Sequence, residues 1–148
     1  AGDLVAPFAA KLLPPEAGVL PAKLFPGAVH VIYGNNDGER DGLKKVLPQI
    51  VDGPLRVTVD TPGCLDGKTT IAMAHFRDWF KPADLAGADV VISGHDHTAD
   101  IQTWPADERE VVFINPGECC GWGNERCTVA LLDLSGPKPT AELIDVKG

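Results

Sequence analysis

The sequence predicts a mixed α/β fold in which two packed sheets are flanked by helices. In the first part of the chain, strand-like runs alternate with segments of helical spacing, which is typical of a parallel sheet. From residue 100 onward, strand-like runs follow one another through polar turns, which is typical of antiparallel hairpins. The chain has 148 residues, of which 44% are hydrophobic and 23% are charged, enough to bury one core. No internal repeat or linker divides it, so residues 1–148 are predicted to form a single domain.

The first half of the chain carries the alternating pattern. Pro7 suits the first turn of a helix. Asp41 suits the N-cap of a longer helix, whose apolar residues recur at helical spacing. A β-branched run that ends at Gly34 predicts a strand. In chain order we therefore expect a helix at 7–13, a proline-rich loop at 14–27, a strand at 28–33, and a helix at 41–51 whose last turn is ended or kinked by Pro48.

The second half is predicted to consist mostly of strands. Short apolar or alternating runs are bounded there by Gly, Pro, Asp and Asn. Residues 78–87 carry a weaker helical pattern, and the polar segment at 105–108 separates two runs as in a hairpin. The expected strands are at 55–59, 69–74, 89–93, 101–104, 110–114, 128–134 and 141–146.

Composition and charge narrow the classes of function. A formal charge of −8 argues against binding a nucleic-acid polymer, which needs a basic surface. No apolar run approaches the roughly 20 residues of a membrane span, and no signal peptide is visible, so we expect no membrane partner and a cytoplasmic location. Four cysteines without a CxxC pair predict reduced, mostly buried thiols. Metal binding or redox chemistry at Cys119 or Cys120 is the alternative.

Two histidines follow an apolar run at the centre of the pattern. The stretch Asp89-Val-Val-Ile-Ser-Gly-His-Asp-His97 predicts a strand that is buried on both faces and ends at Gly94. Side chains at i and i+2 of an extended segment point the same way, so His95 and His97 are expected to project together. They would project from the carboxyl end of the strand, where open α/β sheets bind ligands. Imidazole is the commonest metal ligand, so the pair indicates a metal site, and two solvated loop histidines are the alternative.

A candidate ligand also follows the other predicted strands of the first part. If those strands lie side by side, the candidates meet at one edge of the sheet: Asp3, Asn35, His75, His95 and His97. This mixed oxygen and nitrogen set suits Mn, Fe, Ni, Zn or Co better than calcium, and without thiolates it is not a structural zinc site. A carboxylate such as Asp3 can bridge two cations, and paired cations are the usual means of attacking phosphate esters. Taken singly, Asp3 could be an N-cap, Asn35 a turn residue and His75 a hydrogen-bonded histidine.

These motifs resemble those of the calcineurin-like metallophosphoesterases, most closely their small phosphodiesterases in bacteria and archaea. The motifs that carry the resemblance are Gly2-Asp3, Gly34-Asn-Asn-Asp37, His75, Gly94-His-Asp-His97 and Asn115-Pro-Gly117. The resemblance implies an α/β/β/α sandwich of two mixed sheets with two divalent metal ions at the strand ends. Manganese is the first candidate for these ions, and Ni, Fe, Zn and Co are the alternatives. It also implies hydrolysis of a small phosphodiester by a hydroxide that bridges the metals, with no protein nucleophile.

The resemblance also assigns roles to single residues. Asp3 would bridge the two ions, and His97 would belong to the second ion. Asn35 and His75 would be catalytic residues as well as metal ligands, and Asp37 would anchor the loop or orient a neighbouring ligand. The complete set of metal ligands that it implies is Asp3, Asn35, His75, His95 and His97.

Three departures from the family pattern bear on function. The Asp-x-His motif that opens the family's domain, and supplies two ligands beside His97, is absent. We expect it before Ala1, together with a first strand and helix. The usual His-Gly-His is His75-Phe-Arg77 here, so the phenyl ring is expected to crowd the site, and the guanidinium either binds a phosphate oxygen as a catalytic group or faces solvent. Asn36 stands where larger relatives carry a catalytic histidine, which favours activated or cyclic diesters.

These departures leave other hypotheses open. Loss of a first strand would expose sheet edges, so we expect the chain to be marginally stable alone or to pair, for example as a homo-oligomer. Some relatives keep the fold as protein-binding scaffolds, as in a retromer subunit, and the changes at residues 76–77 favour that reading. Retention of five converging ligands favours the enzyme. A thiol switch at Cys119 and Cys120 is a third hypothesis.

Overall fold

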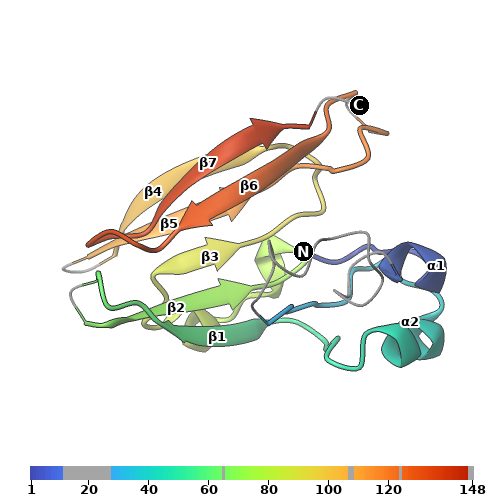
Figure 1. Cartoon of the computed structure of the whole chain (residues 1–148), viewed down its shortest axis with the longest axis horizontal. Coiled ribbons are helices and arrows are strands. Elements are labelled where there is room, and N and C mark those ends of the chain that lie inside the picture. Colours follow the sequence, from blue (N-terminus) through green and yellow to red (C-terminus); the bar gives the residue numbers. More distant parts are fainter. Residues whose placement is uncertain (12–27, 65, 107–108, 124, 147–148) are drawn as a thin grey trace.

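The fold is built on a mixed five-stranded sheet (Figure 1). The computed structural model describes residues 1–11, 28–64, 66–106, 109–123 and 125–146. In spatial order the strands are β1 (Leu55–Asp60), β2 (Lys68–Met73), β3 (Val90–Ile92), β5 (Arg109–Asn115) and β4 (Asp100–Ala106). The three central strands β2, β3 and β5 are parallel, whereas β1 and β4 pair antiparallel at the two edges. The predicted α/β class and the predicted hairpin of β4 and β5 are confirmed.

The early part of the chain is not the purely parallel unit that was expected. β1 and β2 form an antiparallel pair, because the residues between them, 61–67, are too few for the crossover of a parallel connection. Backbone hydrogen bonds close the turn, from the Thr61 N–H to the Gly67 carbonyl at 2.9 Å and from the Gly67 N–H to the Cys64 carbonyl at 3.0 Å.

A second, two-stranded sheet packs on one face of the first (Figure 1). Its strands β6 (Thr128–Asp133) and β7 (Thr140–Asp145) are antiparallel throughout, so this sheet is not mixed as predicted. Alternate residues of the central strands face it. The packed side chains include Val90, Val112 and Ile114 of the first sheet and Ala130, Leu132 and Ala141 of the second. On β6 and β7 the side chains of Leu131 and Ile144 are exposed.

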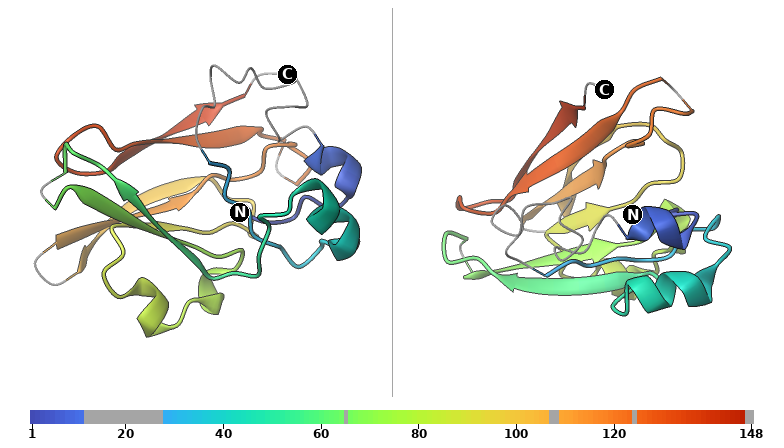
Figure 2. Two further views of the ribbon diagram at one scale, coloured as in Figure 1. Left: turned by 60° about the horizontal axis from the view of Figure 1, so that its bottom comes forward. Right: turned by 45° about the vertical axis from the view of Figure 1, so that its right-hand side comes forward.

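The opposite face of the five-stranded sheet is covered by the segment between β2 and β3 (Figure 2). The helix predicted at 78–87 is divided into two short pieces, η2 (Arg77–Trp79) and α3 (Pro82–Leu85). Pro82 begins the second piece, and proline disfavours helical backbone in the residue before it, so the two pieces do not merge. Phe80, which lies between them, packs on the sheet with Trp104 against Ala72, Ala88, Val91, Val111 and Phe113.

A third hydrophobic cluster packs around the segment that leads to Asn35. Two helices, α1 (Pro7–Ala10) and α2 (Arg40–Val46), contribute to a core of Ala10, Val31, Tyr33, Leu43, Leu47 and Ile50. The helix predicted at 41–51 ends at Val46, because Pro48 cannot continue it. The N-cap is Glu39 rather than the predicted Asp41, and no side-chain hydrogen bond caps the helix.

The strand predicted at 28–33 is reduced to a single bridge. Ile32 pairs with Val51, supported by hydrogen bonds from the Tyr33 N–H to the Val51 carbonyl (3.0 Å) and from the Val51 N–H to the Val31 carbonyl (3.2 Å). The neighbouring residues 52–54 do not continue as a strand, so no ladder forms. The predicted loop at 14–27 and the last residues of the predicted helix at 7–13 lie outside the described residues. Of the helices in the described ranges, none has the length and apolar character needed to cross a membrane.

We expect Leu47→Ala to lower the free energy of unfolding by about 2–5 kcal/mol, because it removes a fully buried side chain and leaves a cavity. Leu131→Ala is the matched control, since Leu131 is 52% exposed and its truncation is expected to cost less than about 1 kcal/mol. Urea denaturation followed by circular dichroism measures both. Equal losses would contradict the assignment of Leu47 to the third cluster.

Candidate functional site

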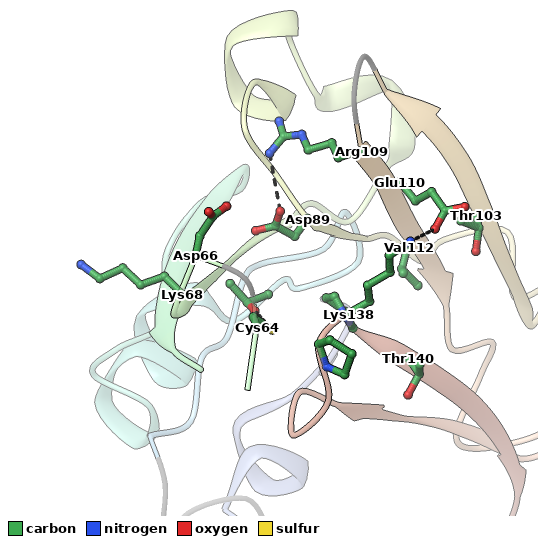
Figure 3. A pocket seen from close by; sticks show the side chains of 13 residues that line it. Cys64, Asp66, Lys68, Asp89, Thr103, Arg109, Glu110, Val112, Lys138 and Thr140 are labelled. Carbon is green, nitrogen blue, oxygen red and sulfur yellow. Dashed lines mark hydrogen bonds and ion pairs between the residues drawn. The ribbon is translucent and has the colours of Figure 1, made fainter. Parts of the chain in front are cut away.

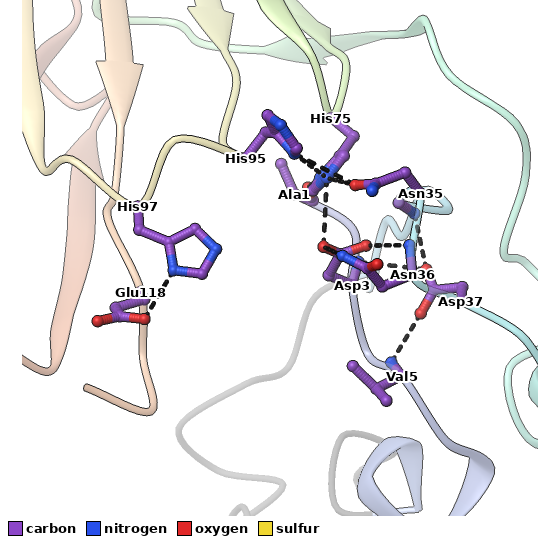
Figure 4. A network of polar contacts seen from close by, with 11 residues as sticks. Ala1, Asp3, Val5, Asn35, Asn36, Asp37, His75, His95, His97 and Glu118 are labelled. Atoms are coloured by element: carbon purple, nitrogen blue, oxygen red, sulfur yellow. Dashed lines mark hydrogen bonds and ion pairs between the residues drawn. The ribbon is translucent and has the colours of Figure 1, made fainter. Parts of the chain in front are cut away.

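Two histidines leave neighbouring parallel strands at the same end of the sheet. β2 and β3 end side by side, and the residues that follow carry His75 and His95 to one edge. Asp3 and Asn35 reach the same place from segments outside the helices and strands (Figure 4). The structure thus brings together four of the five predicted metal ligands.

His75 lies at the centre of this group. Its Nε2 atom is 2.8 Å from Asn35 Oδ1 and 3.3 Å from both Asp3 Oδ2 and His95 Nδ1. His95 Nδ1 also lies 3.2 Å from Asn35 Oδ1. The His75 side chain is 3% exposed and the Asp3 side chain is 19% exposed, whereas Asn35 and His95 are exposed, so solvent reaches the group mainly from the side of Asn35 and His95.

Hydrogen bonding fixes which nitrogen of His75 faces the group. Nδ1 lies 2.7 Å from the Ala1 carbonyl oxygen, which can only accept, so Nδ1 carries a proton and donates it. In the neutral ring, Nε2 then carries a lone pair and no proton. It faces two oxygen acceptors, one from Asn35 and one from Asp3. A metal cation placed between these acceptors would stabilise the group.

The donor set fits a first-row divalent cation. Ligand atoms about 2.0–2.2 Å from a metal lie about 3 Å apart when they are neighbours in an octahedron, and the contacts in this group span 2.8–3.3 Å. Two oxygen and two imidazole donors are a mixture that such ions accept. Across the described ranges, no three His, Cys, Asp or Glu side chains by themselves enclose an ion position. The candidate donor set therefore includes the Asn35 oxygen, which lies 2.8 Å from His75 Nε2 and 3.2 Å from His95 Nδ1.

Asp3 and the loop before α2 hold each other in place. Asn36 donates to Asp3 twice, from its backbone N–H to Oδ1 at 2.9 Å and from Nδ2 to Oδ2 at 2.8 Å. The buried Asp37 carboxylate accepts hydrogen bonds from the backbone N–H groups of Asp3 (3.2 Å), Val5 (2.7 Å) and Gly34 (2.7 Å). Asp37 therefore anchors the loop, and it satisfies backbone donors that have no partner in a helix or strand.

Glycines let these segments approach one another closely. Gly2 has a φ of +87°, and a Cβ atom there would lie 2.7 Å from Gly34 Cα and 2.8 Å from His75 Nδ1. A Cβ atom on Gly34 would overlap the carboxylate and the backbone nitrogen of Asp3. The site therefore requires glycine at both positions, for backbone conformation at the first and for space at the second.

Three predicted ligands have backbone in the left-handed region. The φ angles are +57° at Asp3, +77° at His95 and +61° at His97. Such conformations cost about 1–3 kcal/mol each in residues other than glycine, and they gather at functional sites. A turn with a hydrogen bond from the Asp96 N–H to the Gly94 carbonyl (3.1 Å) follows β3. The expectation that His95 and His97 project together is therefore wrong, because the backbone is not extended there.

His97 lies apart from the four-residue group and pairs with Glu118 (Figure 4). Its Nδ1 is 2.8 Å from Glu118 Oε2, and its side chain is 47% exposed. The Glu118 carboxylate is buried and also accepts the Gly123 N–H at 2.7 and 2.9 Å. Sequence analysis did not assign a role to Glu118. The available signal was an acidic residue directly after the Asn115-Pro-Gly117 turn, at the end of a strand that neighbours β3.

The two residues that depart from the family pattern take different places. The Arg77 guanidinium lies over the rings of Trp104 (4.3 Å) and Phe113 (4.9 Å) and lines a different cavity. This placement does not support the predicted catalytic role of Arg77, because cation–π contact holds the charge on the outer face of the sheet. The Phe76 ring stays at the site, stacked on His95 with the ring centroids 3.6 Å apart.

The site opens into a cavity of about 480 Å³. Its described lining contains no arginine or lysine, and it includes Asp3, His75, His95, His97, Glu118, Cys119 and Cys120. All four cysteines are free. Cys119 and Cys120 are exposed, so the prediction of mostly buried thiols is wrong for this pair, which lies on a surface loop.

A larger cavity of about 680 Å³ lies at the opposite ends of the central strands (Figure 3). Four of its charged side chains form pairs, Arg109 with Asp89 at 3.5 Å and Lys138 with Glu110 at 2.8 Å, and Asp66 and Lys68 also line it. The hydrogen bond from Lys138 lowers the pKa of Glu110. None of the predicted ligands lines this cavity. The smaller cavity is therefore the candidate site, because four of the five predicted ligands, Asp3, His75, His95 and His97, line it.

We expect Gly34→Ala to displace Asp3 from His75 and to lower the free energy of unfolding by about 1–3 kcal/mol, because the added methyl group overlaps Asp3. Gly38→Ala is the matched control, since no atom lies within 4 Å of its Cβ position. Urea denaturation and ¹H–¹⁵N spectra of the histidine side chains measure the two effects. A Gly34→Ala protein with the spectrum and stability of the wild type would contradict this packing.

Two of the known proteins that resemble this chain are phosphodiesterases. The chain is 37% identical over 107 residues to a phosphodiesterase of Methanocaldococcus jannaschii, which covers 68% of this chain and 59% of that protein. The chain thus spans about three-fifths of the length of this relative. A solved archaeal phosphodiesterase has a TM-score of 0.61 at 27% identity, covering 97% of this chain and 79% of that one.

A more distant likeness is to vacuolar protein sorting 29 from Cryptosporidium parvum, with a TM-score of 0.47 at 14% identity over 81% of this chain and 70% of that one. This likeness is too weak to support an inference. The family model for the calcineurin-like phosphoesterase superfamily domain matches residues 1–136. The chain therefore belongs to the calcineurin-like phosphoesterase superfamily.

Proposed function

We propose that this chain forms most of a metal-dependent phosphodiesterase that hydrolyses a small phosphate diester. The observation that carries the proposal is the group of oxygen and nitrogen donors within 3.3 Å of His75 Nε2. A protonated imidazole alone would satisfy one of these acceptors, whereas a cation satisfies them together. Membership of the superfamily and the likeness to two phosphodiesterases support the same function.

The proposed metal centre uses the predicted ligands unequally. Asp3, Asn35, His75 and His95 would hold one divalent ion, with manganese as the first candidate and Ni, Fe, Zn or Co as alternatives. His97 would belong to a second ion, with Asp3 as the bridging ligand. In the structure His97 contacts Glu118 and not the four-residue group, which supports a weaker second site.

The charge of the molecule supports metal dependence. A phosphodiester is an anion, the chain has a formal charge of −8, and no described arginine or lysine lines the cavity. Binding the substrate therefore needs another source of positive charge at the site. Divalent cations there would polarise the phosphoryl oxygens and lower the pKa of a water molecule.

The side chains around the centre would orient it. The Ala1 carbonyl holds the His75 Nδ1 proton, so Nε2 faces the cavity as a ligand atom. Asn36 aligns the Asp3 carboxylate from two sides. Hydrolysis adds water to phosphorus and breaks one ester P–O bond. The N–H groups of Asn36 already donate to Asp3, so this residue supplies no proton to the leaving oxygen, which favours activated or cyclic diesters.

A protein-binding scaffold is the second candidate function. The stacking of Phe76 on His95 and the position of Arg77 away from the site favour it, since both weaken the expected machinery. The retained donor group favours the enzyme. Activity measurements separate the two, because a scaffold would not turn over a diester.

We expect His75→Ala to reduce manganese-dependent hydrolysis of bis(4-nitrophenyl) phosphate by the full-length protein about 100-fold or more, because the central ligand is lost. His30→Ala is the matched control, since His30 is exposed and is not hydrogen-bonded to Asp3, Asn35, His75 or His95 in the described part of the chain. Release of 4-nitrophenolate measures both variants. A folded wild-type protein without turnover in any divalent metal would contradict the enzyme.

We expect His95→Ala to remove the tightest manganese site and His97→Ala to leave it, because His95 contacts Asn35 and His75 whereas His97 pairs with Glu118. Isothermal titration with manganese measures stoichiometry and affinity in each variant. The proposed asymmetry would fail if His97→Ala weakened the tight site as much as His95→Ala does.

A further inference from the structure

We propose that Phe76 and Trp79 form an aromatic surface that binds an aryl or nucleobase group of the diester. The inference rests on the proposed function and narrows it to a substrate class, small diesters that carry a flat aromatic group. It concerns the segment in which this chain departs from the family motif, His75-Phe-Arg77.

The aromatic surface begins at the donor group itself. The rings of Phe76 and His95 are tilted by 32° with their centroids 3.6 Å apart. Trp79 continues the surface, with its ring centroid 4.8 Å from that of Phe76 and 6.0 Å from that of His75. A continuous set of ring faces and edges therefore leads from the imidazoles that would hold the phosphate to solvent.

Neither of the two rings of this aromatic surface belongs to the hydrophobic core. Phe76 and Trp79 are absent from the three hydrophobic clusters of the described residues, and Trp79 is 39% exposed. The backbone beneath them is fixed by hydrogen bonds from the Trp79 N–H to the Phe76 carbonyl (3.2 Å) and from the Phe80 N–H to the Arg77 carbonyl (3.3 Å). A partly exposed indole on a fixed turn is suited to stacking, because its position is set before the ligand arrives.

Charge and ring chemistry select the ligand class. Stacking on an aromatic face accepts any base, because each base has a π surface. The acidic chain disfavours a long polyanion. A single phosphate near the imidazoles with one aromatic group over Trp79 satisfies both conditions. The guanidinium of Arg77 does not compete for the ring, since it lies over Trp104 and Phe113.

The first test compares two diesters with the same leaving group in the manganese-loaded, full-length protein. Bis(4-nitrophenyl) phosphate keeps an aryl group after cleavage, and methyl 4-nitrophenyl phosphate keeps a methyl group. We expect Trp79→Ala to raise KM for the aryl diester roughly threefold to tenfold and to change KM for the methyl diester less than about twofold. Trp122→Ala is the matched control, a substitution of a tryptophan that is 91% exposed and makes no ring contact with Phe76 or Trp79 among the described residues.

The second test measures binding without turnover. Adenosine 5′-monophosphate and ribose 5-phosphate are titrated into the manganese-loaded protein while tryptophan fluorescence is recorded. We expect quenching by the adenosine ligand only, its loss in Trp79→Phe and its retention in Trp122→Phe. Manganese titration of each variant verifies that the metal site is intact.

The outcomes separate this inference from the proposed function. Equal KM changes for the two diesters, or none, together with quenching that survives Trp79→Phe, would overturn the aromatic surface while leaving a phosphodiesterase. Absence of turnover in the wild type would overturn the proposed function, and the fluorescence titration would still decide whether Trp79 binds the base. A selective loss with the aryl diester and the adenosine ligand supports the inference.

Discussion

The site depends on one buried carboxylate that accepts three backbone N–H groups. Asp37 receives hydrogen bonds from Asp3, Val5 and Gly34, and so joins the first residues of the chain to the loop before α2. Neither segment forms a strand there, so these donors would otherwise be left without a protein partner. The arrangement lets two irregular segments approach within the space that only glycine allows. Local polar bonding thus sets geometry that a sheet ladder would set elsewhere.

Electrostatics explains why this point of the surface is chemically distinct. The larger cavity contains charged groups, but acidic and basic side chains neutralise one another there. At the edge of β2 and β3, by contrast, hydrogen-bond acceptors from several side chains face one another. A backbone carbonyl sets the orientation of His75 there. Such a group concentrates potential metal ligands within a half-open cavity, and this property, more than cavity size, identifies a functional site.

The part of the site that follows from periodicity could be predicted from the sequence. His75 and His95 directly follow buried parallel strands, so the rule that ligands bind at strand ends places both correctly. His97 could not be placed in this way, because its position depends on a left-handed backbone that an i, i+2 rule does not describe. The position of Arg77 depends on its contacts with the rings of Trp104 and Phe113, which lie far away in the chain. Its placement away from the site therefore could not be predicted from the local sequence. The same holds for β1, whose antiparallel pairing depends on a short turn more than on its own sequence.

Residues 1–5 are held by hydrogen bonds at the site, and Leu4 also packs against the third cluster. Ala1, Asp3 and Val5 precede the first helix, and their hydrogen bonds go to His75 and to the loop that contains Asn36 and Asp37. Local unfolding of residues 1–5 would therefore remove a carboxylate and release the His75 ring in one step. The hydrogen bonds at the site also hold residues 1–5 in place. Local unfolding of this segment and loss of the site are therefore one event. Hydrogen exchange at the amides bonded to Asp37 would report this opening directly.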